Sequence, residues 1–469
     1  MTKIYKLISI SIFLQFTIGV NAQVATNYTF TQTTNAYSPL TGGSIVGGPL
    51  NDEEVFQGLP IGFQFKFNGM CYNEFGIGTN GYIEFGAGTI IDDYNMISVG
   101  VDNNIVAVLN SDLQLGSNIT ATTVIGSPVV LIETSMGLSI GDTINSGYGF
   151  PAGTIITALS ATSFTASTNA ITVISGGEIL FLNGEMRYQT IGTAPNRTLV
   201  VQWKNARNFG SLDGRNDNFN IQLRIEETTN KISIIYGSFF CGGNPSAITY
   251  EVGLRGITTS DFNSRTNPTN WATTIASSVN TDACAMDALL IPSSGLTFNW
   301  SSSIQPSDPI ITATSSNTML CSGQSATLSV TGANSYTWST SSNSTSIVVN
   351  PTTTSNYTVS GTDANNCSNT TTFTQSVSIC TDVNSISTIG NSTINVFPNP
   401  TNDLLTVHLS ALSEHMHFEI YSNLGQFIVS EKIINTSFSI NLENYTCGIY
   451  SLRLIEDGVA TFKANIIKQ

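Results

Sequence analysis

The chain has 469 residues, of which 41% are hydrophobic and only 10% are Asp, Glu, Lys or Arg. An average globular protein carries about 25% of these charged residues. Sixteen basic residues against 31 acidic ones give a net charge of −15. That balance argues against nucleic acid as a partner, because a basic surface is needed to neutralise phosphates, and equally against anionic membranes.

The N-terminus has the pattern of an export signal. Lys3 and Lys6 precede an apolar run from residue 7 to residue 20, and Val20-Asn21-Ala22 provides a small-residue cleavage site. The run is shorter than the roughly 20 apolar residues that span a bilayer. We therefore predict a signal peptide over residues 1–22 and no transmembrane span, with an uncleaved anchor as the alternative.

Residues 23–303 alternate apolar and polar side chains with the period of a β-strand. Residues 61–67 place an apolar side chain at every second position, and Asn68-Gly69 then supplies a turn. Residues 219–225 and 231–237 read as an antiparallel hairpin around the turn at 227–230. No window shows a convincing helical period, so the sequence predicts an all-β fold with several β-sandwich domains in tandem.

A small β-module is predicted to be inserted in this domain at residues 117–184. The stretch has no Lys or Arg, its only acids are Glu133, Asp142 and Glu178, and closely spaced turn residues separate short β-branched runs. An exposed loop accepts such an insertion because its two ends lie close together. A long hairpin extension of the host domain is the alternative.

Residues 304–380 predict a further sandwich of short, evenly spaced strands, and residues 381–393 a polar linker. Seven cysteines in an exported chain favour disulfides. Cys321 and Cys367 bracket this sandwich and are the expected pair, with Cys241 and Cys284 as a second pair. The spacing assigns no partner to Cys71, Cys380 and Cys447.

Residues 23–393 contain few candidate catalytic residues. All three histidines, at 408, 415 and 417, lie beyond this region, which excludes a Ser-His-Asp or Cys-His site within it. Paired carboxylates remain, as in glycoside hydrolysis, and no hydrolase motif surrounds them. We expect no enzymatic activity and keep a hydrolase as the alternative, with these candidate acids: Asp92, Asp93, Asp102, Glu226 and Glu227.

Calcium is the one cofactor that the acids and amides suggest, because Ca²⁺ prefers carboxylate and carbonyl oxygens. Two loops are dense in such groups, but neither has the spacing of an EF-hand. Asx turns explain the same residues, since Asn and Asp side chains bond their own backbone. The candidate ligands are Asp213, Asn216 and Asp217 in one loop and Asp92 and Asp93 in the other.

The C-terminal residues carry four motifs in order: Asn395-Val-Phe-Pro-Asn-Pro400, Ile420-Tyr-Ser-Asn-Leu-Gly425, Gly448-Ile-Tyr-Ser-Leu452 and a closing basic segment. They resemble the C-terminal sorting domain of type IX (Por) secretion substrates of Bacteroidetes, which places that domain at residues 394–469. The resemblance implies the secretion machinery as a partner, a secreted or cell-surface location, and attachment to surface lipopolysaccharide as one outcome of export. The positions that match the family's motifs are Pro398, Asn399, Pro400, Gly425, Gly448 and Tyr450.

Two other parts resemble known families. Gly62-Phe-x-Phe-x-Phe-Asn-Gly69 and Asn80-Gly-Tyr-Ile-x-Phe85 are similar to a recurring N-terminal β-domain of exported Bacteroidetes proteins, to which no activity is attached. The Cys321, Trp338, Cys367 order makes residues 304–380 similar to Ig-like spacer domains. We therefore expect a non-enzymatic adhesion or surface-structural protein that binds a glycan or matrix ligand. The alternative is a carbohydrate-binding or carbohydrate-active protein.

Overall fold

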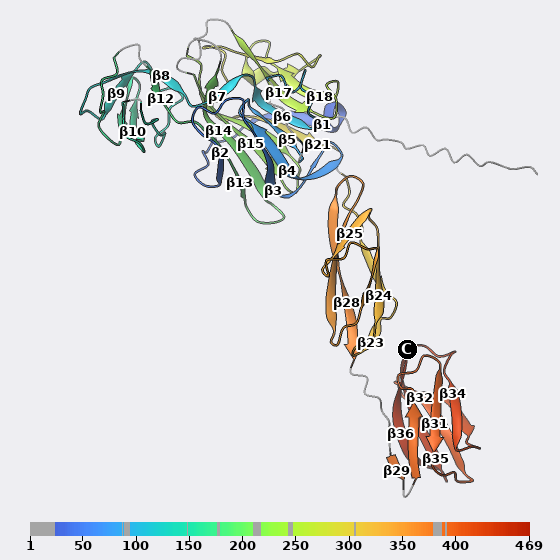
Figure 1. The fold of residues 1–469 in the computed structure, drawn as a ribbon. Helices are drawn as coiled ribbons and strands as arrows, with labels where there is room; N and C mark the ends of the chain where they lie inside the picture. Colours follow the sequence, from blue (N-terminus) through green and yellow to red (C-terminus); the bar gives the residue numbers. More distant parts are fainter. Residues whose placement is uncertain are drawn as a thin grey trace, which may run out of the picture. The chain divides into compact units, whose positions relative to one another are not determined.

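The computed structural model describes residues 24–86, 88, 94–147, 149–175, 179–209, 217–242, 247–303, 306–378, 387–389 and 392–469. The predicted signal peptide at 1–22 lies outside these residues. Apart from the short turns α1 (Val24–Asn27) and η1 (Trp271–Thr273), the regular elements are strands (Figure 1), which confirms the all-β prediction. No helix among the described residues is long and apolar enough to cross a membrane.

The chain divides into two compact units. The first comprises residues 1–308 together with Ala364–Ser368, and the second comprises Pro309–Asp363 and Asn369–Gln469. The short turn Ala364–Ser368 therefore belongs with the first unit, although the strands on either side of it belong to the second.

Two antiparallel eight-stranded sheets build most of the first unit. One has the order β1-β21-β16-β15-β14-β13-β2, with β7 paired to β14; the other has the order β19-β18-β17-β6-β5-β4-β3, with β20 paired to β17. The strands of the first sheet are β1 (Tyr28–Thr34), β2 (Ser44–Gly47), β7 (Leu113–Leu115), β13 (Glu185–Ile191), β14 (Thr198–Asn208), β15 (Asn218–Glu226), β16 (Ile232–Phe240) and β21 (Leu296–Ser302). Those of the second are β3 (Val55–Phe67), β4 (Met70–Gly78), β5 (Tyr82–Phe85), β6 (Ile105–Asn110), β17 (Ile248–Arg255), β18 (Phe262–Thr266), β19 (Ile275–Ala276) and β20 (Cys284–Met286).

A single hydrophobic core contains the inward-facing side chains of both sheets. The alternation that predicted the strands also fills this core, because every second residue of a strand points to the same face. Two polar side chains connect the sheets across it: Trp203 Nε1 donates to the Gly78 carbonyl at 3.0 Å, and the Tyr236 hydroxyl donates to the Val108 carbonyl at 3.2 Å. Their hydrogen bonds allow large rings to be buried without leaving a polar atom unpaired.

The turn dipeptides act as the sequence predicts. Asn68 and Gly69 both have positive φ, at 49° and 80°, and join β3 to β4 as a two-residue hairpin in which Phe67 pairs with Met70. Positive φ at both central residues matches the twist of the flanking strands. The predicted hairpin of β15 and β16 is also present, with Ile225 opposite Ile232.

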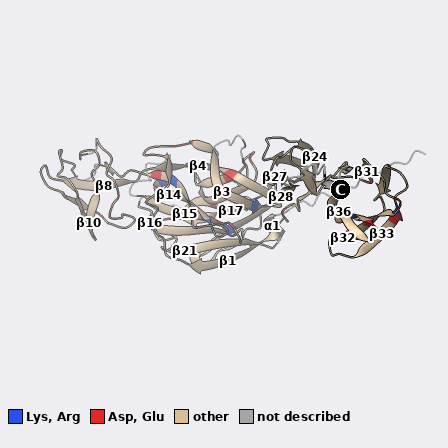
Figure 2. Cartoon of the chain, turned by 90° about the horizontal axis from the view of Figure 1, so that it is seen from below, with Lys and Arg blue, Asp and Glu red and all other residues tan. Residues whose placement is uncertain are grey.

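The residues predicted as an inserted module form a separate five-stranded sheet of order β10-β11-β9-β8-β12. This sheet has a hydrophobic core of its own, built around Val130, Phe150, Phe164 and Leu180. Figure 2 shows that this part of the chain carries almost no charged residues. Its strands are β8 (Asn118–Thr123), β9 (Val129–Ile132), β10 (Ile156–Ser160), β11 (Ser163–Ala166) and β12 (Ile179–Phe181).

A middle sandwich follows, with sheets β22-β24-β26 and β23-β28-β27-β25 around Leu328, Trp338 and Val359. Strand β23 runs parallel to β28, whereas β22 pairs with β24, β24 with β26 and β25 with β27 in the antiparallel sense. The strands are β22 (Thr312–Ser315), β23 (Met319–Cys321), β24 (Ala326–Thr331), β25 (Ser335–Trp338), β26 (Ser346–Val349), β27 (Ser355–Thr362) and β28 (Ser368–Ser378).

The predicted pairing of Cys321 with Cys367 is wrong, because Cys367 is bonded to Cys71 of β4. Cys367 immediately precedes β28, while Cys321 lies opposite Ser378 at the far end of that strand. A strand of 11 residues spans roughly 36 Å, which no disulfide can bridge. Cys321 is itself disulfide-bonded, but to a different partner.

The predicted bond between Cys241 and Cys284 is also wrong, since both thiols are free and buried. Each sulfur has its own polar partner. Cys241 interacts with the Asp217 carboxylate, and Cys284 Sγ donates to the Arg265 carbonyl at 3.4 Å. Burial raises the pKa of each thiol to about 12, so neither has thiolate character at neutral pH.

The C-terminal residues fold as a third sandwich, with sheets β29-β30-β31-β34 and β33-β32-β35-β36. Its core contains Leu405, Ile420, Leu452 and Ile466. The strands are β29 (Ser387–Ile389), β30 (Ser392–Phe397), β31 (Leu404–Leu409), β32 (Met416–Ser422), β33 (Phe427–Lys432), β34 (Ser437–Asn441), β35 (Gly448–Glu456) and β36 (Val459–Lys468).

Candidate functional site

Three acidic side chains gather beside β7 in the first unit; we call Asp52, Glu53 and Asp112 the carboxylate group. The chain before β3 reaches this position by pairing with β7: Leu50 N donates to the Leu115 carbonyl at 2.8 Å, and Leu115 N donates to the Asn51 carbonyl at 2.9 Å. Asp112 immediately precedes β7. The pairing therefore brings together acids that are about 60 residues apart in the sequence.

Arg207 of β14 is the cation next to this group. It lies opposite Gln114 in the β14–β7 pairing, and its guanidinium donates to the Gln114 side-chain oxygen. Arg207 is only 9% exposed. Burial lowers its pKa, whereas the negative charges of Asp217 and Asp52 oppose that shift. One buried guanidinium thus faces carboxylates from two different loops.

The acids of the carboxylate group repel one another. Burial, followed by the charges of Asp112 and Glu53, raises the pKa of Asp52 to about 6, and burial together with Glu53 raises the pKa of Asp112. Asp52 Oδ1 and Asp112 Oδ1 are buried and make no hydrogen bond. Buried, unpaired carboxylate oxygens are costly unless a cation or a proton neutralises them, and oxygen donors of this kind suit Ca²⁺.

The described residues next to the two predicted calcium loops contact the carboxylate group or its neighbour Arg207. Tyr94, which follows one loop, donates its hydroxyl to Glu53 Oε1, and Asp217, which ends the other, interacts with Arg207. Asp217 is 2% exposed and accepts from Gly242 N at 2.9 Å, and burial raises its pKa to about 6. The other predicted ligands, Asp92, Asp93, Asp213 and Asn216, lie outside the described residues.

Sequence reasoning missed Asp52, Glu53 and Asp112 because none belongs to a recognisable motif. The available signal was the acidic run at residues 52–54 directly after Pro49, Leu50 and Asn51. Only the pairing of this run with β7 reveals that Asp112 is nearby.

A second perturbed acid is Glu84 on β5. Burial and then the charge of Asp102 raise the pKa of Glu84 to about 7, while Arg255 opposes the shift. Arg255 also donates to the Met96 carbonyl at 2.6 Å, and Glu251 on the same strand accepts from Ile97 N at 2.6 Å. The charged residues of β17 therefore hold the loop around residue 97 against the sheet.

The remaining candidate acids have structural partners. Glu227 forms a bidentate ion pair with Arg197, with distances of 2.5 and 2.8 Å, and Arg197 lowers its pKa. Glu226 accepts from Thr229 Oγ1 at 2.6 Å and lies 3.9 Å from Lys231 Nζ. Both acids therefore stabilise the hairpin turn between β15 and β16.

Among the described residues, one group of metal-ligating side chains brings three donor atoms within 4.8 Å of one another: Cys71, Asp308 and Cys367. The two sulfurs are joined in the disulfide. Because metals bind the thiolate form of cysteine, this group is not a metal site.

The sorting-motif residues have distinct structural roles. Asn399 is 4% exposed; its Nδ2 donates to the Asn465 carbonyl at 2.7 Å, and its Oδ1 accepts from Ile467 N at 2.8 Å. Tyr450 donates its hydroxyl to the Thr446 carbonyl at 2.7 Å. Gly425 has φ +79° in the turn before β33, which favours glycine. Gly448 has open space around it and no positive φ, so its backbone does not require glycine.

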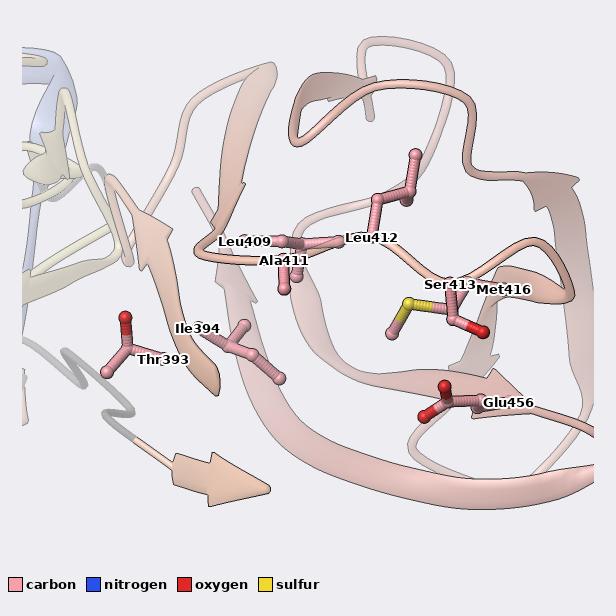
Figure 3. Close-up of a pocket in the computed structure, with 8 residues that line it drawn as sticks. All are labelled: Thr393, Ile394, Leu409, Ala411, Leu412, Ser413, Met416 and Glu456. Atoms are coloured by element: carbon pink, nitrogen blue, oxygen red, sulfur yellow. The ribbon is translucent and has the colours of Figure 1, made fainter. Parts of the chain in front are cut away.

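A small pocket of about 120 Å³ lies between the two sheets of the C-terminal sandwich. Figure 3 shows Ile394 and Leu409 on one side of it and Met416 and Glu456 on the other. Ile394, Leu409 and Met416 are buried hydrophobic residues. The pocket is large enough for one apolar side chain and far smaller than the roughly 300–1,000 Å³ of a typical ligand site.

Two family models match the chain. Residues 27–129 and 152–302 match the family described as NIDO related, and residues 395–469 match the secretion system C-terminal sorting domain. The first match covers more than half of the chain and omits residues 130–151, in the module. No curated protein matches the chain.

Two solved structures show a weak similarity to the chain. Dimeric latent PorU from Porphyromonas gingivalis is similar at 10% identity over 60% of this chain and 32% of that chain, with a TM-score of 0.15. The BSP domain of a biofilm-associated protein is similar at 10% identity over 76% of this chain and 96% of that domain, with a TM-score of 0.14. The chain thus spans about a third of the PorU chain. TM-scores this low support no inference about fold or function.

Proposed function

The chain belongs to the NIDO-related family and ends in a type IX sorting domain, and on that premise we propose that it is a non-enzymatic binding protein presented outside the cell. The sorting domain indicates a secreted or cell-surface location and implies the type IX machinery as a partner. The NIDO-related domain is then the part that meets the extracellular ligand.

One observation carries this proposal: the family match and the sorting domain occupy opposite ends of the chain, at residues 27–302 and 395–469. The sandwich at residues 309–378 occupies the interval between them. This order keeps the domain that directs export separate in the sequence from the domain that would bind a ligand. We assign the middle sandwich the role of an Ig-like spacer.

The state of the described acids supports binding over catalysis. Glu226 and Glu227 stabilise a hairpin turn, and Asp217 is hydrogen-bonded in the interior. A glycoside hydrolase instead needs two acids facing each other across the substrate. The aromatic side chains of Tyr236, Trp271, Phe298 and Trp300 pack on one another in the core, where a sugar cannot stack on them.

The calcium prediction gains ligands from the carboxylate group. Asp52 and Asp112 offer buried oxygens without hydrogen bonds, and Asp52 lies close enough to Arg207 and Asp112 for both to affect its pKa. A bound cation would remove the repulsion among these acids. Their oxygens do not all lie within 4.8 Å of one another in the structure, so we propose that Ca²⁺ draws the three carboxylates together when it binds and thereby orders the surrounding loops for ligand recognition.

The test is binding of the full mature chain to an array of glycans and extracellular-matrix proteins, with and without EDTA. A calcium-dependent adhesin is supported if EDTA abolishes binding and D52N/D112N weakens it. E133Q is the control and should bind as the native chain does, because Glu133 is an exposed acid in the inserted module. Binding that survives EDTA contradicts the calcium role and keeps the binding function. Release of sugars from the array contradicts the non-enzymatic assignment and favours the hydrolase. A surface-structural role follows if no component is bound.

A further inference from the structure

The disulfide between Cys71 and Cys367 closes a very long loop. The two residues are 296 positions apart, and they are 3% and 0% exposed. Cys71 belongs to β4, which pairs with the edge strand β3 of the second sheet, while Cys367 lies in the turn Ala364–Ser368. A covalent bond therefore joins the first sheet domain directly to the chain that enters β28.

Polar contacts surround this bond. Cys71 N donates to the Asn365 carbonyl at 2.9 Å, and Ser368 N donates to the Gln64 side-chain oxygen at 2.7 Å. Lys66 forms an ion pair of 2.9 Å with Asp308, at the point where the chain leaves the first unit. Asp308 is thus attached to β3, and the turn Ala364–Ser368 is attached to both β3 and β4.

The position of Cys367 in the sequence determines how short the covalent path between the C-terminal domain and β4 is. Strand β28 starts at Ser368, and it is the last strand of the middle sandwich before the C-terminal domain. A covalent path from the C-terminal domain to β4 therefore needs only β28 and the disulfide. The other strands of the middle sandwich, β22 to β27, lie within the closed loop.

We propose that this disulfide is a mechanical bypass: tension between the C-terminal part and the first domain runs through β28 and the Cys71–Cys367 bond, and residues 72–366 cannot be drawn out in series. The source of the tension, a surface anchor at one end and a bound ligand at the other, rests on the proposed function. The bypass itself is a property of the covalent connectivity and can be tested without any ligand.

The disulfide withholds a large contour length of chain from extension under tension. Extended chain spans about 3.3–3.6 Å per residue, so a closed loop of 296 residues withholds roughly 1,000 Å. Cys321 is bonded elsewhere and could retain part of the middle sandwich. Residues 72–303 have no second restraint, because Cys241 and Cys284 are free. Those roughly 230 residues alone account for about 770 Å.

The experiment is single-molecule force spectroscopy on the full mature chain, held at its two ends. The native chain should extend to roughly 500 Å, from the residues outside the closed loop. The C71S/C367S variant should release roughly 770–1,000 Å more. K66M/Q64A, which removes the neighbouring polar contacts and keeps the disulfide, should release only the native length. Equal lengths for the native chain and C71S/C367S, or the longer length for K66M/Q64A, would overturn the proposal.

A gel measurement covers the case in which C71S/C367S does not fold. The chain with its natural cysteines is given a protease site at residues 304–305, inside the closed loop, and is then cleaved. The two fragments should migrate as one species without reductant and as two with it. Separation without reductant would overturn the bypass, and a failure of array binding would leave this result unchanged.

Discussion

Lys204 of β14 forms an ion pair of 2.8 Å with Asp142 of the inserted module, whose side chain is fully buried. Asp142 also accepts from Ser139 N at 2.8 Å through its other oxygen. Asp142 is the one buried carboxylate among the described residues of the module, and a cation of the host sheet therefore neutralises it. This pair couples a module that has its own core to the domain that contains it.

Removing one partner of this pair should be more harmful than removing both. K204M leaves a buried carboxylate without a counter-charge and should lower the free energy of unfolding by about 3 kcal/mol. The double variant K204M/D142L removes both charges and should recover at least half of that loss. Denaturant unfolding of the full chain measures both values. An equal or larger loss in the double variant would contradict the coupling.

The raised carboxyl pKa values predict a stability that falls as the pH rises. Asp52 and Asp217 have pKa values of about 6, and Glu84 of about 7, against ordinary values near 4. The folded state therefore holds these protons more tightly than the unfolded chain does. Their contribution is fully present below about pH 4 and is lost as the pH rises through 6 to 7.

The change that tests this effect is E84Q, which removes the titration of one group. The native chain should melt at a higher temperature at pH 5 than at pH 8, and in E84Q that difference should shrink by about 2 °C. E74Q, at an exposed position of β4, is the matched control and should leave the difference unchanged. A pH dependence that is identical in all three proteins would refute the assignment to Glu84.

Calcium should stabilise the native chain through the carboxylate group. If the affinity resembles that of extracellular calcium modules, with Kd of about 10⁻⁴ to 10⁻³ M, 10 mM Ca²⁺ adds roughly 1.4–2.7 kcal/mol. Thermal unfolding with Ca²⁺ and with EDTA measures this gain. D52N/D112N should lose it and E133Q should keep it. No shift in the native chain would rule out a calcium site of this affinity.

Asn399 should be essential to the C-terminal sandwich because both ends of its amide bond the chain around β36. N399A removes a donor to Asn465 and an acceptor from Ile467, and should cost about 2–3 kcal/mol. N423A, at an exposed turn residue, should cost less than about 0.5 kcal/mol. We expect N399A to lower the exported fraction of the protein and N423A to leave it unchanged. Normal export of an N399A chain whose C-terminal sandwich is unfolded would show that export does not need this fold.

Local patterns predicted the strands and their turns well. Residues 61–67 alternate, and Asn68-Gly69 accepts positive φ, so β3 and its hairpin follow from neighbouring residues alone. The same holds for the hairpin of β15 and β16, which follows from the alternation of residues 219–225 and 231–237 and the turn between them. Period and turn chemistry are properties of a few adjacent residues, and for that reason they can be read from one sequence.

Long-range contacts do not follow from such local patterns. Cys367 is closer in sequence to Cys321 than to Cys71, yet the parallel pairing of β23 with β28 places Cys321 at the far end of that strand. Asp52 and Asp112 likewise meet only because the chain before β3 pairs with β7. Both features depend on how distant strands associate, which alternation does not specify.

The most direct test of the account is export of the full chain compared with a chain that lacks residues 394–469, in a host with a working type IX system. Protease digestion of intact cells, together with assay of the medium, measures how much protein is outside. We predict that the full chain is surface-exposed or released and that the truncated chain stays in the periplasm. Display or release of the truncated chain at the level of the full chain would contradict the central claim.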